Sequence, residues 1–203
     1  MANDILDTTY GAYHLADHPE LYESARNNTF RFILNPALDT LIPAGLDADL
    51  ATENDYLTNS QHRLECSVIT SSVPHFEIAP ITIKRGNSQV QFAGSITWKA
   101  GSLKLNDFVG ARTKDIIMAW QARAYNILND TVALAANYKF DCTLIEYNPD
   151  MTKKIREWTL KGCWISSIDE GEFDTQNHDE RTFTATLQYD RGIPKSYNTK
   201  VNA

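Results

Sequence analysis

Alternating apolar and polar side chains predict β-strands along most of the chain. Residues 181–190, "RTFTATLQYD", show the pattern most clearly, because four apolar residues from Phe183 to Tyr189 alternate with threonine and glutamine. Comparable segments are residues 29–35, 62–74, 75–84, 89–98, 100–105, 139–147 and 153–162. Short connections rich in Gly, Pro and Asn separate several of them, which favours antiparallel neighbours.

One segment, residues 113–128, follows the period of a helix instead. Its apolar stripe consists of Ile116, Trp120, Ala124 and Ile127. Thr113 is a suitable cap, and Asp115 suits the positive end of the helix dipole. With about seven to nine strands, the pattern predicts a mainly β fold. We expect an antiparallel β-sandwich or small barrel, flanked by one principal α-helix, with a long loop and terminal arms.

The alternation changes phase inside "REWTLKGCWISSID", residues 156–169. Trp158 and Leu160 share one parity, whereas Cys163 and Ile165 after Gly162 have the other. Because side chains alternate with a period of two, a slip of one residue moves the pattern to the opposite face. We expect a β-bulge at Gly162 that supplies the extra residue.

Charge is unevenly distributed along the chain. The net charge is −7, and residues 1–60 hold 10 acids and 2 bases, against 16 acids and 17 bases in the remainder. A sequence-reading DNA-binding protein would normally show a basic stripe, so that class is disfavoured. The acids continue through residues 36–61, which form a long Pro- and Asn-containing segment. This is either a solvated acidic loop or a segment with a function, since structureless loops above about 12–15 residues are uncommon.

The sequence contains no motif that indicates a catalytic site. The sequence lacks the serine-hydrolase, phosphate-loop, dinucleotide-binding and zinc-protease patterns. His14 and His18 are four residues apart but have no obvious third ligand, and Cys66, Cys142 and Cys163 lack zinc-type spacing. The cysteines are typical of core positions in a reducing compartment. We therefore predict no catalytic, metal or cofactor site, and no run approaches the ~20 apolar residues of a membrane helix.

The C-terminal third resembles a known family. The hairpin "YNPDMTK", the segment "REWTLKGCWISSID", the acidic "GEFDTQNHDE" and the final "TFTATLQYD" are similar to the tail tube proteins of contractile-tailed bacteriophages. The features carrying the resemblance are Trp158, Gly162–Cys163, the 169–180 linker and the strand from Phe183 to Tyr189. Earlier, "SVPHFEIAPITIKRGNSQ" is similar to the central strand pair and "DFVGARTKDIIMAWQ" to the single helix of that family. The similarity covers roughly residues 28–190.

The resemblance implies a structural subunit of a tail tube. Such subunits assemble as hexameric rings, part of each sheet joining its neighbours in a barrel, and the rings stack inside a contractile sheath as a conduit for DNA ejection. The implied partners are further copies of the chain, the sheath protein, the baseplate or tube initiator and the tail terminator. The lumen would hold the tape measure protein and genome DNA, without sequence-specific binding. The implied location is the virion tail, assembled in the host cytoplasm, with no membrane binding by the subunit.

The same resemblance divides the chain into parts. Residues 1–26 would be an N-terminal arm, residues 27–190 the tube β-domain and residues 191–203 a C-terminal tail. The loop 36–61 becomes the candidate contact between rings. Its apolar anchors would be Leu38, Leu41, Ile42, Leu46 and Leu50.

Further residues receive roles from this assignment. Lumen-facing candidates are Glu65 and Glu77, on the polar faces of the expected strands between residues 62 and 84. An acidic wall would let DNA slide, because like charges do not bind. The strand that changes face at Gly162 would pack on its own helix and then on a neighbouring subunit. Candidates for the core and the strand step are Trp120, Trp158, Gly162 and Trp164.

Three alternatives remain open. The first is the inner tube of a type VI or phage-like injection system, which differs from a phage tail in its cargo. The second is a ligand-binding β-sandwich with Trp98 or Trp164 as a stacking surface, which would be a monomer with a concave aromatic site. The third is an enzyme whose catalytic residues form no recognisable motif.

Overall fold

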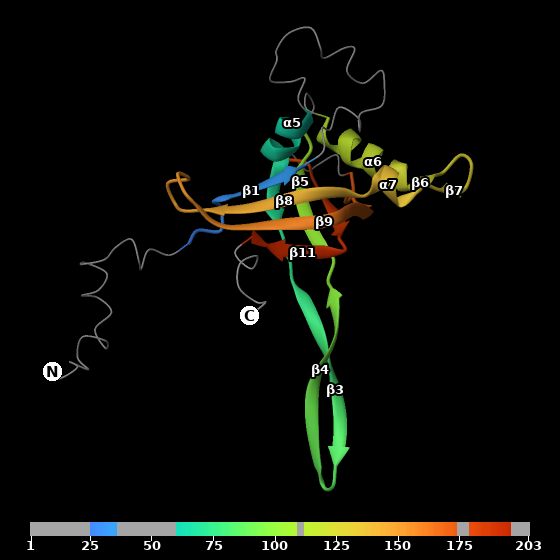
Figure 1. The fold of residues 1–203 in the computed structure, drawn as a ribbon. Coiled ribbons are helices and arrows are strands. Elements are labelled where there is room, and N and C mark those ends of the chain that lie inside the picture. The colour runs from blue at the N-terminus through green and yellow to red at the C-terminus, as the bar shows by residue number, and fades with distance from the viewer. Residues whose placement is uncertain (1–24, 36–59, 109–111, 174–178, 196–203) are drawn as a thin grey trace, which may run out of the picture.

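The molecule is a sandwich of antiparallel strands with a long hairpin projecting from it (Figure 1). The computed structural model describes residues 25–35, 60–108, 112–173 and 179–195. The main sheet has the order β1-β8-β9-β10-β5-β2, and β11 also pairs with β9. Its strands are β1 (Phe30–Leu34), β2 (Val68–Ser71), β5 (Gly101–Asn106), β8 (Phe140–Tyr147), β9 (Lys154–Asp169), β10 (Thr182–Gln188) and β11 (Arg191–Pro194). The predicted mainly β, antiparallel fold is confirmed, and within the described residues the sheet stays open between β1 and β2.

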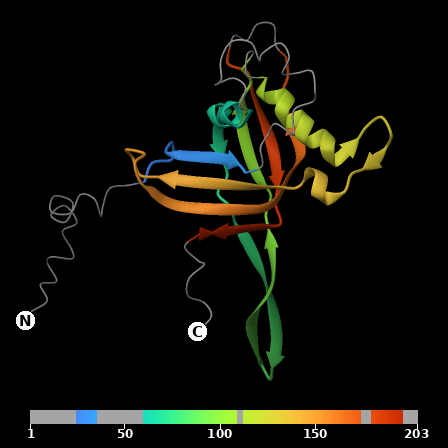
Figure 2. The ribbon, with the colours of Figure 1, turned by 45° about the horizontal axis from the view of Figure 1, so that its top comes forward.

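Strand β9 belongs to both layers of the sandwich. Its first part pairs with β8 and β11, and its last part pairs with β10. One layer is therefore β1-β8-β9-β11 and the other is β9-β10-β5-β2, and their strands cross steeply in both views (Figures 1 and 2). Strands that pass between layers through a bulge form the corners of such sandwiches.

The corner in β9 is a β-bulge at Gly162. The pairing of β8 with β9 shifts between Phe140 and Cys142, so that Lys161 and Gly162 together lie opposite Asp141. Gly162 has a φ of 66°, in the left-handed region that favours glycine. The bulge predicted from the sequence is therefore confirmed.

The consequence of this bulge differs from the prediction. Leu160, before the bulge, and Cys163 and Ile165, after it, are all buried in the same hydrophobic core. The bulge cancels the change of phase, so both halves of β9 present apolar side chains to one interior. The hypothesis that the second half packs on a neighbouring subunit is wrong for these residues. Trp158 is half-buried at the edge of that core.

Helix α6 (Thr113–Ala124) packs across β9, as the helical stripe predicted. Ile116 and Trp120 are fully buried, and the Trp120 indole Nε1 donates a hydrogen bond to the Tyr138 carbonyl at 2.9 Å. Trp164 is half-buried and packs edge-on against the Tyr138 ring, with centroids 5.9 Å apart. Tyr138 ends the short helix α7 (Ala135–Tyr138).

Two details of the helix prediction are wrong. The helix ends at Ala124 instead of residue 128, and the chain continues as the small hairpin of β6 (Tyr125–Asn126) and β7 (Thr131–Val132). The Asn126 side chain accepts a hydrogen bond from the Leu128 amide at 2.9 Å, a local turn that competes with the helix. Thr113 is not the cap, because it is the first helical residue and its buried hydroxyl hydrogen-bonds with Ser67 at 2.6 Å.

The predicted strand at residues 62–74 is largely wrong. Residues Ser60–Ser67 form helix α5, and only Val68–Ser71 form a strand. Leu64 and Ser67, three residues apart, are buried, whereas Cys66 is exposed. This spacing fits one face of a helix, although Leu64, Cys66 and Val68 also satisfy the period of a strand.

The ends of the predicted β-domain also differ. Strand β11 lies inside the expected C-terminal tail, so residues 191–194 belong to the sandwich. The expected N-terminal arm, apart from residues 25–26, and the loop 36–61, apart from the start of α5, lie outside the described residues. None of the helices that the structure does describe combines the length and apolar character needed to cross a membrane.

Candidate assembly surface

The hairpin of β3 (Phe76–Arg85) and β4 (Ser88–Trp98) projects from the sandwich as a two-stranded ribbon (Figures 1 and 2). Within the described residues each of the two strands pairs only with the other, so both outer edges of the ribbon are unpaired. Every residue of β3 is exposed. A lone hairpin of this kind is marginally stable in water, and free strand edges are templates for pairing with another chain. The predicted strands and their turn at Gly86, with φ 64°, are confirmed.

Large apolar residues face one another across the ribbon. The pairs are Phe76 with Trp98, Ile78 with Ile96, Ile81 with Phe92, and Ile83 with Val90. Apart from Trp98, which is half-buried, these side chains are between 39% and 55% exposed. Exposed apolar clusters of this size mark surfaces that bind other molecules.

The ribbon offers apolar side chains on both of its faces. Pairing shifts between Ile78 and Pro80, where β4 contributes one extra residue. Because β3 alternates normally through this point, Ile78 and Ile81 lie on opposite faces. Gly94 lies at the shift, and a Cβ there would collide with the Ala79 carbonyl oxygen and lie 3.0 Å from the Ile81 side chain. Exposed apolar side chains therefore lie on one face at the base of the ribbon and on the other face at its tip.

The base of the ribbon is fastened to the sandwich. The Trp98 ring packs edge-on against Phe76 and Tyr189, with centroids 5.0 Å and 6.0 Å away. The Tyr189 hydroxyl accepts a hydrogen bond from the His75 amide at 3.3 Å, and the Lys99 amide donates to the His75 carbonyl at 3.1 Å. These contacts set the direction in which the ribbon leaves the body.

The two lumen-facing candidates lie on different elements. Glu77 is exposed on β3 and pairs with Lys99 at 2.6 Å, and this hydrogen bond lowers the pKa of the Glu77 carboxyl. Glu65 lies on helix α5 instead of the expected strand, where its carboxylate accepts a hydrogen bond from Arg31 Nε at 2.8 Å.

The ribbon itself is not acidic. Between residues 76 and 98 it carries one acid, Glu77, and two bases, Lys84 and Arg85. The acidic bias of the chain belongs to other segments, because residues 1–24 and 36–59 hold ten acids and no Lys or Arg. The ring-contact candidates Leu38, Leu41, Ile42, Leu46 and Leu50 lie in the second of these segments, outside the described residues.

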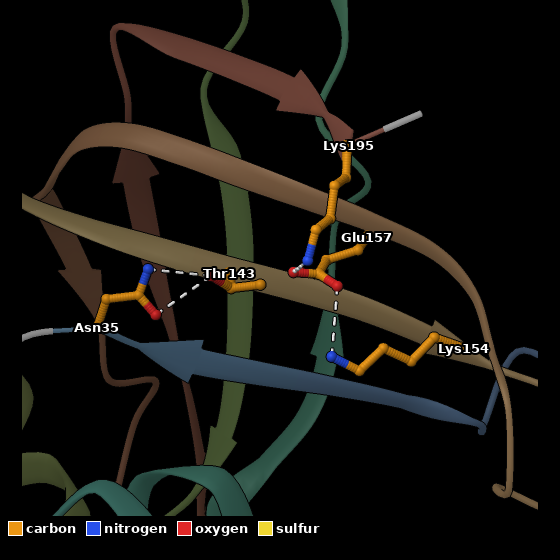
Figure 3. Close-up of polar contacts among 5 residues, drawn as sticks. All are labelled: Asn35, Thr143, Lys154, Glu157 and Lys195. Carbon is orange, nitrogen blue, oxygen red and sulfur yellow. Dashed lines mark hydrogen bonds and ion pairs between the residues drawn. The ribbon is translucent and has the colours of Figure 1, made fainter. Parts of the chain in front are cut away.

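The β8–β9 layer carries polar contacts that join it to the chain beside β1 and β11 (Figure 3). Glu157 accepts hydrogen bonds from Lys195 at 3.0 Å and Lys154 at 3.3 Å, and the Lys195 contact contributes most to lowering the pKa of Glu157. Nearby, the side-chain amide of Asn35 donates a hydrogen bond to the Thr143 hydroxyl at 3.0 Å. These contacts fasten the chain ends that adjoin β1 and β11.

The titratable and aromatic candidates of the sequence occupy separate places in the described part of the structure. Across the ranges that the structure describes, no group of three or more His, Cys, Asp or Glu side chains could hold a metal ion. Cys142 and Cys163 are free thiols in the core, and burial raises the pKa of Cys142. Trp98 and Trp164, the candidates for a ligand-stacking surface, are both half-buried against aromatic neighbours.

Several solved structures have a fold similar to that of this chain. Neither a protein-family model nor a curated protein matches the sequence. A solved chain of the sheath–tube complex of PVC, an extracellular contractile injection system, has a TM-score of 0.57 at 15% identity, covering 88% of this chain and 96% of that one. The tube-terminating cap of the anti-feeding prophage has a TM-score of 0.58 at 15% identity, covering 85% and 91%. A chain of the anti-feeding prophage baseplate has a TM-score of 0.53 at 12% identity, covering 84% and 95%.

These likenesses define the class of fold. The chain has the fold found in the tube, cap and baseplate assemblies of contractile injection systems. The predicted resemblance to tail tube proteins is confirmed at the level of the fold.

Proposed function

We propose that this protein is a structural subunit of the tube of a contractile tail-like machine. The observation that carries the proposal is the β3–β4 ribbon, which has two edges unpaired by any described strand and apolar side chains on both faces. Pairing each ribbon with the sheets of neighbouring copies would remove the free edges, as closure of a barrel does. It would also bury the apolar pairs that one chain leaves in water.

The ring is proposed to be hexameric and to stack on further rings, as the resemblance to tail tube proteins implies. The acidic segment 36–61 is the proposed contact between rings, with Leu38, Leu41, Ile42, Leu46 and Leu50 as its anchors. The proposed partners are the sheath, the terminator and the baseplate. Support comes from the solved structures of similar fold, which belong to a sheath–tube complex, a tube-terminating cap and a baseplate.

The cargo separates two versions of this function. In a phage tail the lumen would hold a tape measure protein and conduct DNA, and the virion would contain the subunit. The single acid and two bases of the ribbon form no strong basic stripe, so a wall built from it would not hold DNA tightly. Glu77, which is exposed on β3, keeps its proposed lumen-facing role. Glu65 does not, because it lies on helix α5 with its side chain only 6% exposed against Arg31. The second version, an injection-system tube that delivers protein, is favoured by the fold of the PVC and anti-feeding prophage chains.

Negative-stain electron microscopy with mass measurement in solution tests the proposal. We expect the full chain to form rings or hollow tubes of uniform bore, either alone or after addition of a baseplate. The variant Ile81→Asp should stay monomeric with an unchanged circular dichroism spectrum, because a buried carboxylate in the interface is costly. Thr82→Asp, at the next position of the same strand, is the matched control and should assemble. A wild-type chain that stays monomeric with a baseplate present would refute the proposal, as would normal assembly of Ile81→Asp.

A further inference from the structure

A second apolar projection lies far from the ribbon, at the tip of the β6–β7 hairpin. Its large side chains are almost fully exposed: Ile127 82%, Leu128 93%, Val132 75% and Leu134 76%. The hairpin is held in shape by the Tyr125 hydroxyl, which donates to Asp130, and by the Ala133 amide, which donates to the Ala124 carbonyl at 3.1 Å. The hairpin and Leu134, just after it, thus expose four aliphatic side chains to water, which is typical of a surface that binds another molecule.

A hollow of matching character opens between the two layers of the sandwich. It has a volume of 380 Å³ and lies between β2 and the ends of β1, β8 and β9. Its apolar lining is Phe30, Ile69, Val73, Leu144, Ile145 and Trp158. Ile69 and Val73 are 40% and 56% exposed, so the lining is accessible from outside. This hollow is called the sandwich mouth below.

The hairpin and the sandwich mouth occupy opposite ends of the molecule. In both views β6–β7 projects from one end, and the β8–β9 turn and the start of β1, beside the mouth, lie at the other (Figures 1 and 2). The two surfaces therefore cannot meet within one chain. They can meet between neighbours arranged head to tail, the type of interface that generates a closed ring.

The charges of the two surfaces are complementary. Asp130 is the only charged residue between residues 125 and 134. The sandwich mouth is lined by Arg26 and Arg156, together with Glu146, which pairs with Arg156 at 3.0 Å. A tip with one negative charge would thus approach a mouth with a net positive charge, which favours this pairing over two like surfaces.

We propose that the β6–β7 hairpin of one subunit inserts its apolar tip into the sandwich mouth of the next subunit. This inference rests on the proposed ring and adds a lateral contact separate from the β3–β4 ribbon. Leu128 and Ile127 are the inserted side chains, and Asp130 lies near Arg26 of the neighbour. The occupant of the mouth is a second copy of this chain.

Cysteine cross-linking tests the contact directly. In a Cys66→Ser background, which removes the exposed native thiol, we combine Leu128→Cys with Ile69→Cys and add a short bismaleimide. Assembled particles should give a ladder of covalent oligomers, with residues 128 and 69 joined in peptides identified by mass spectrometry. The control pairs Ile69→Cys with Phe173→Cys, a residue that is 84% exposed and lies outside the β6–β7 hairpin, and it should give no ladder.

A second variant and a labelling experiment separate the possible outcomes. Leu128→Asp should raise the subunit concentration needed for ring formation about tenfold, a change of about 1.4 kcal/mol. Rings that form normally with Leu128→Asp and give no ladder would overturn the tip contact while leaving the tube function intact. If the wild-type chain and the Cys66→Ser parent both form no rings with a baseplate present, the tube function itself fails and the contact fails with it. If removing residues 1–24 accelerates maleimide labelling of Ile69→Cys in monomers, the chain's own N-terminal segment fills the mouth and the proposal is wrong.

Discussion

At the scale of single residues, Gly162 controls the corner of the sandwich. Its left-handed conformation allows β9 to gain one residue, and its missing side chain leaves room for Asp190. A Cβ at position 162 would lie 2.9 Å from the Asp190 carboxyl carbon. That carboxylate also pairs with Lys139 at 2.8 Å, and the Asp190 amide donates to the Lys161 carbonyl at 2.9 Å. The glycine is required for both its conformation and its lack of volume.

We expect Gly162→Ala to lower the free energy of unfolding by about 2–3 kcal/mol, since the left-handed conformation alone costs a non-glycine residue about 1–2 kcal/mol. Gly171→Ala is the matched control, because Gly171 also has a φ of 66° but no atom lies within 4 Å of its added Cβ. The control should cost about 1 kcal/mol. Urea unfolding of unassembled subunits measures both, and equal losses would contradict the steric role of Asp190.

Glu157 makes the free energy of unfolding depend on pH. Its pKa is lowered in the folded state, chiefly by the hydrogen bond from Lys195, so its contribution is present above the unfolded pKa and is lost as pH falls through the folded value. Glu157→Gln should therefore reduce stability at pH 7 by less than about 1 kcal/mol and leave stability near pH 3 almost unchanged. Urea midpoints at both pH values check this, and a larger loss at pH 3 would contradict the sign.

At the scale of elements, strands were predictable where one side chain in two enters the core. The alternation of β10 is confirmed, because Phe183, Ala185 and Leu187 are buried. Helix α5 was missed because Leu64, Cys66 and Val68 also fit a strand, and only the burial of Ser67 shows the helical face. Propensity and period cannot decide such short segments, because tertiary contacts outweigh them.

The assembly surface was predictable only in part. The sequence placed strands at β3 and β4, but their alternation does not show that the pair leaves the body as a ribbon with free edges. Likewise the stripe ending at Ile127 predicted a buried residue, whereas the local turn at Asn126 ends the helix and exposes it. Exposure depends on which segments lie alongside, and this information is not local to the sequence.

For the ribbon we expect Gly94→Ala to impair assembly more than folding. An added Cβ would collide with the Ala79 carbonyl oxygen and distort the bulge that turns the apolar residues from one face to the other. Because the ribbon packs little on the body, the free energy of unfolding measured in urea should change by under about 1 kcal/mol. Ala93→Ser, at the adjacent exposed position, is the control and should assemble normally. Light scattering during tube growth measures the effect, and equal growth of both variants would contradict the role of the bulge.

At the scale of the whole molecule, acidic residues are concentrated in two segments of the sequence. Residues 1–24 and 36–59 hold ten acids and no Lys or Arg, whereas residues 61–203 hold 16 acids and 17 bases. The acid-rich segments would bring negative charge to the nearly neutral bodies of neighbouring copies. Contacts of this kind weaken as salt screens them.

Removing residues 40–55 should separate ring formation from stacking. Before this segment, the backbone amide of Asn35 donates a hydrogen bond to the Asp141 carbonyl at 2.9 Å, and after it helix α5 begins at Ser60. The sandwich should therefore fold without residues 40–55. We expect rings that do not stack, visible as single discs by electron microscopy. A replacement of the same residues by a Gly/Ser linker of equal length should behave like the deletion. Tubes of normal length from either variant would show that the rings stack through another surface.

Because β9 passes through both layers, it also determines how the sandwich responds to force. In most sandwiches the layers are held to each other by side-chain packing, which yields when they slide. Here an unbroken stretch of 16 residues runs through the corner, and Lys139 and Asp190 brace the bend. Tension applied along one layer would pass to the other through covalent bonds of the backbone. A tube wall built from such units would transmit the thrust of a contraction with little internal slip.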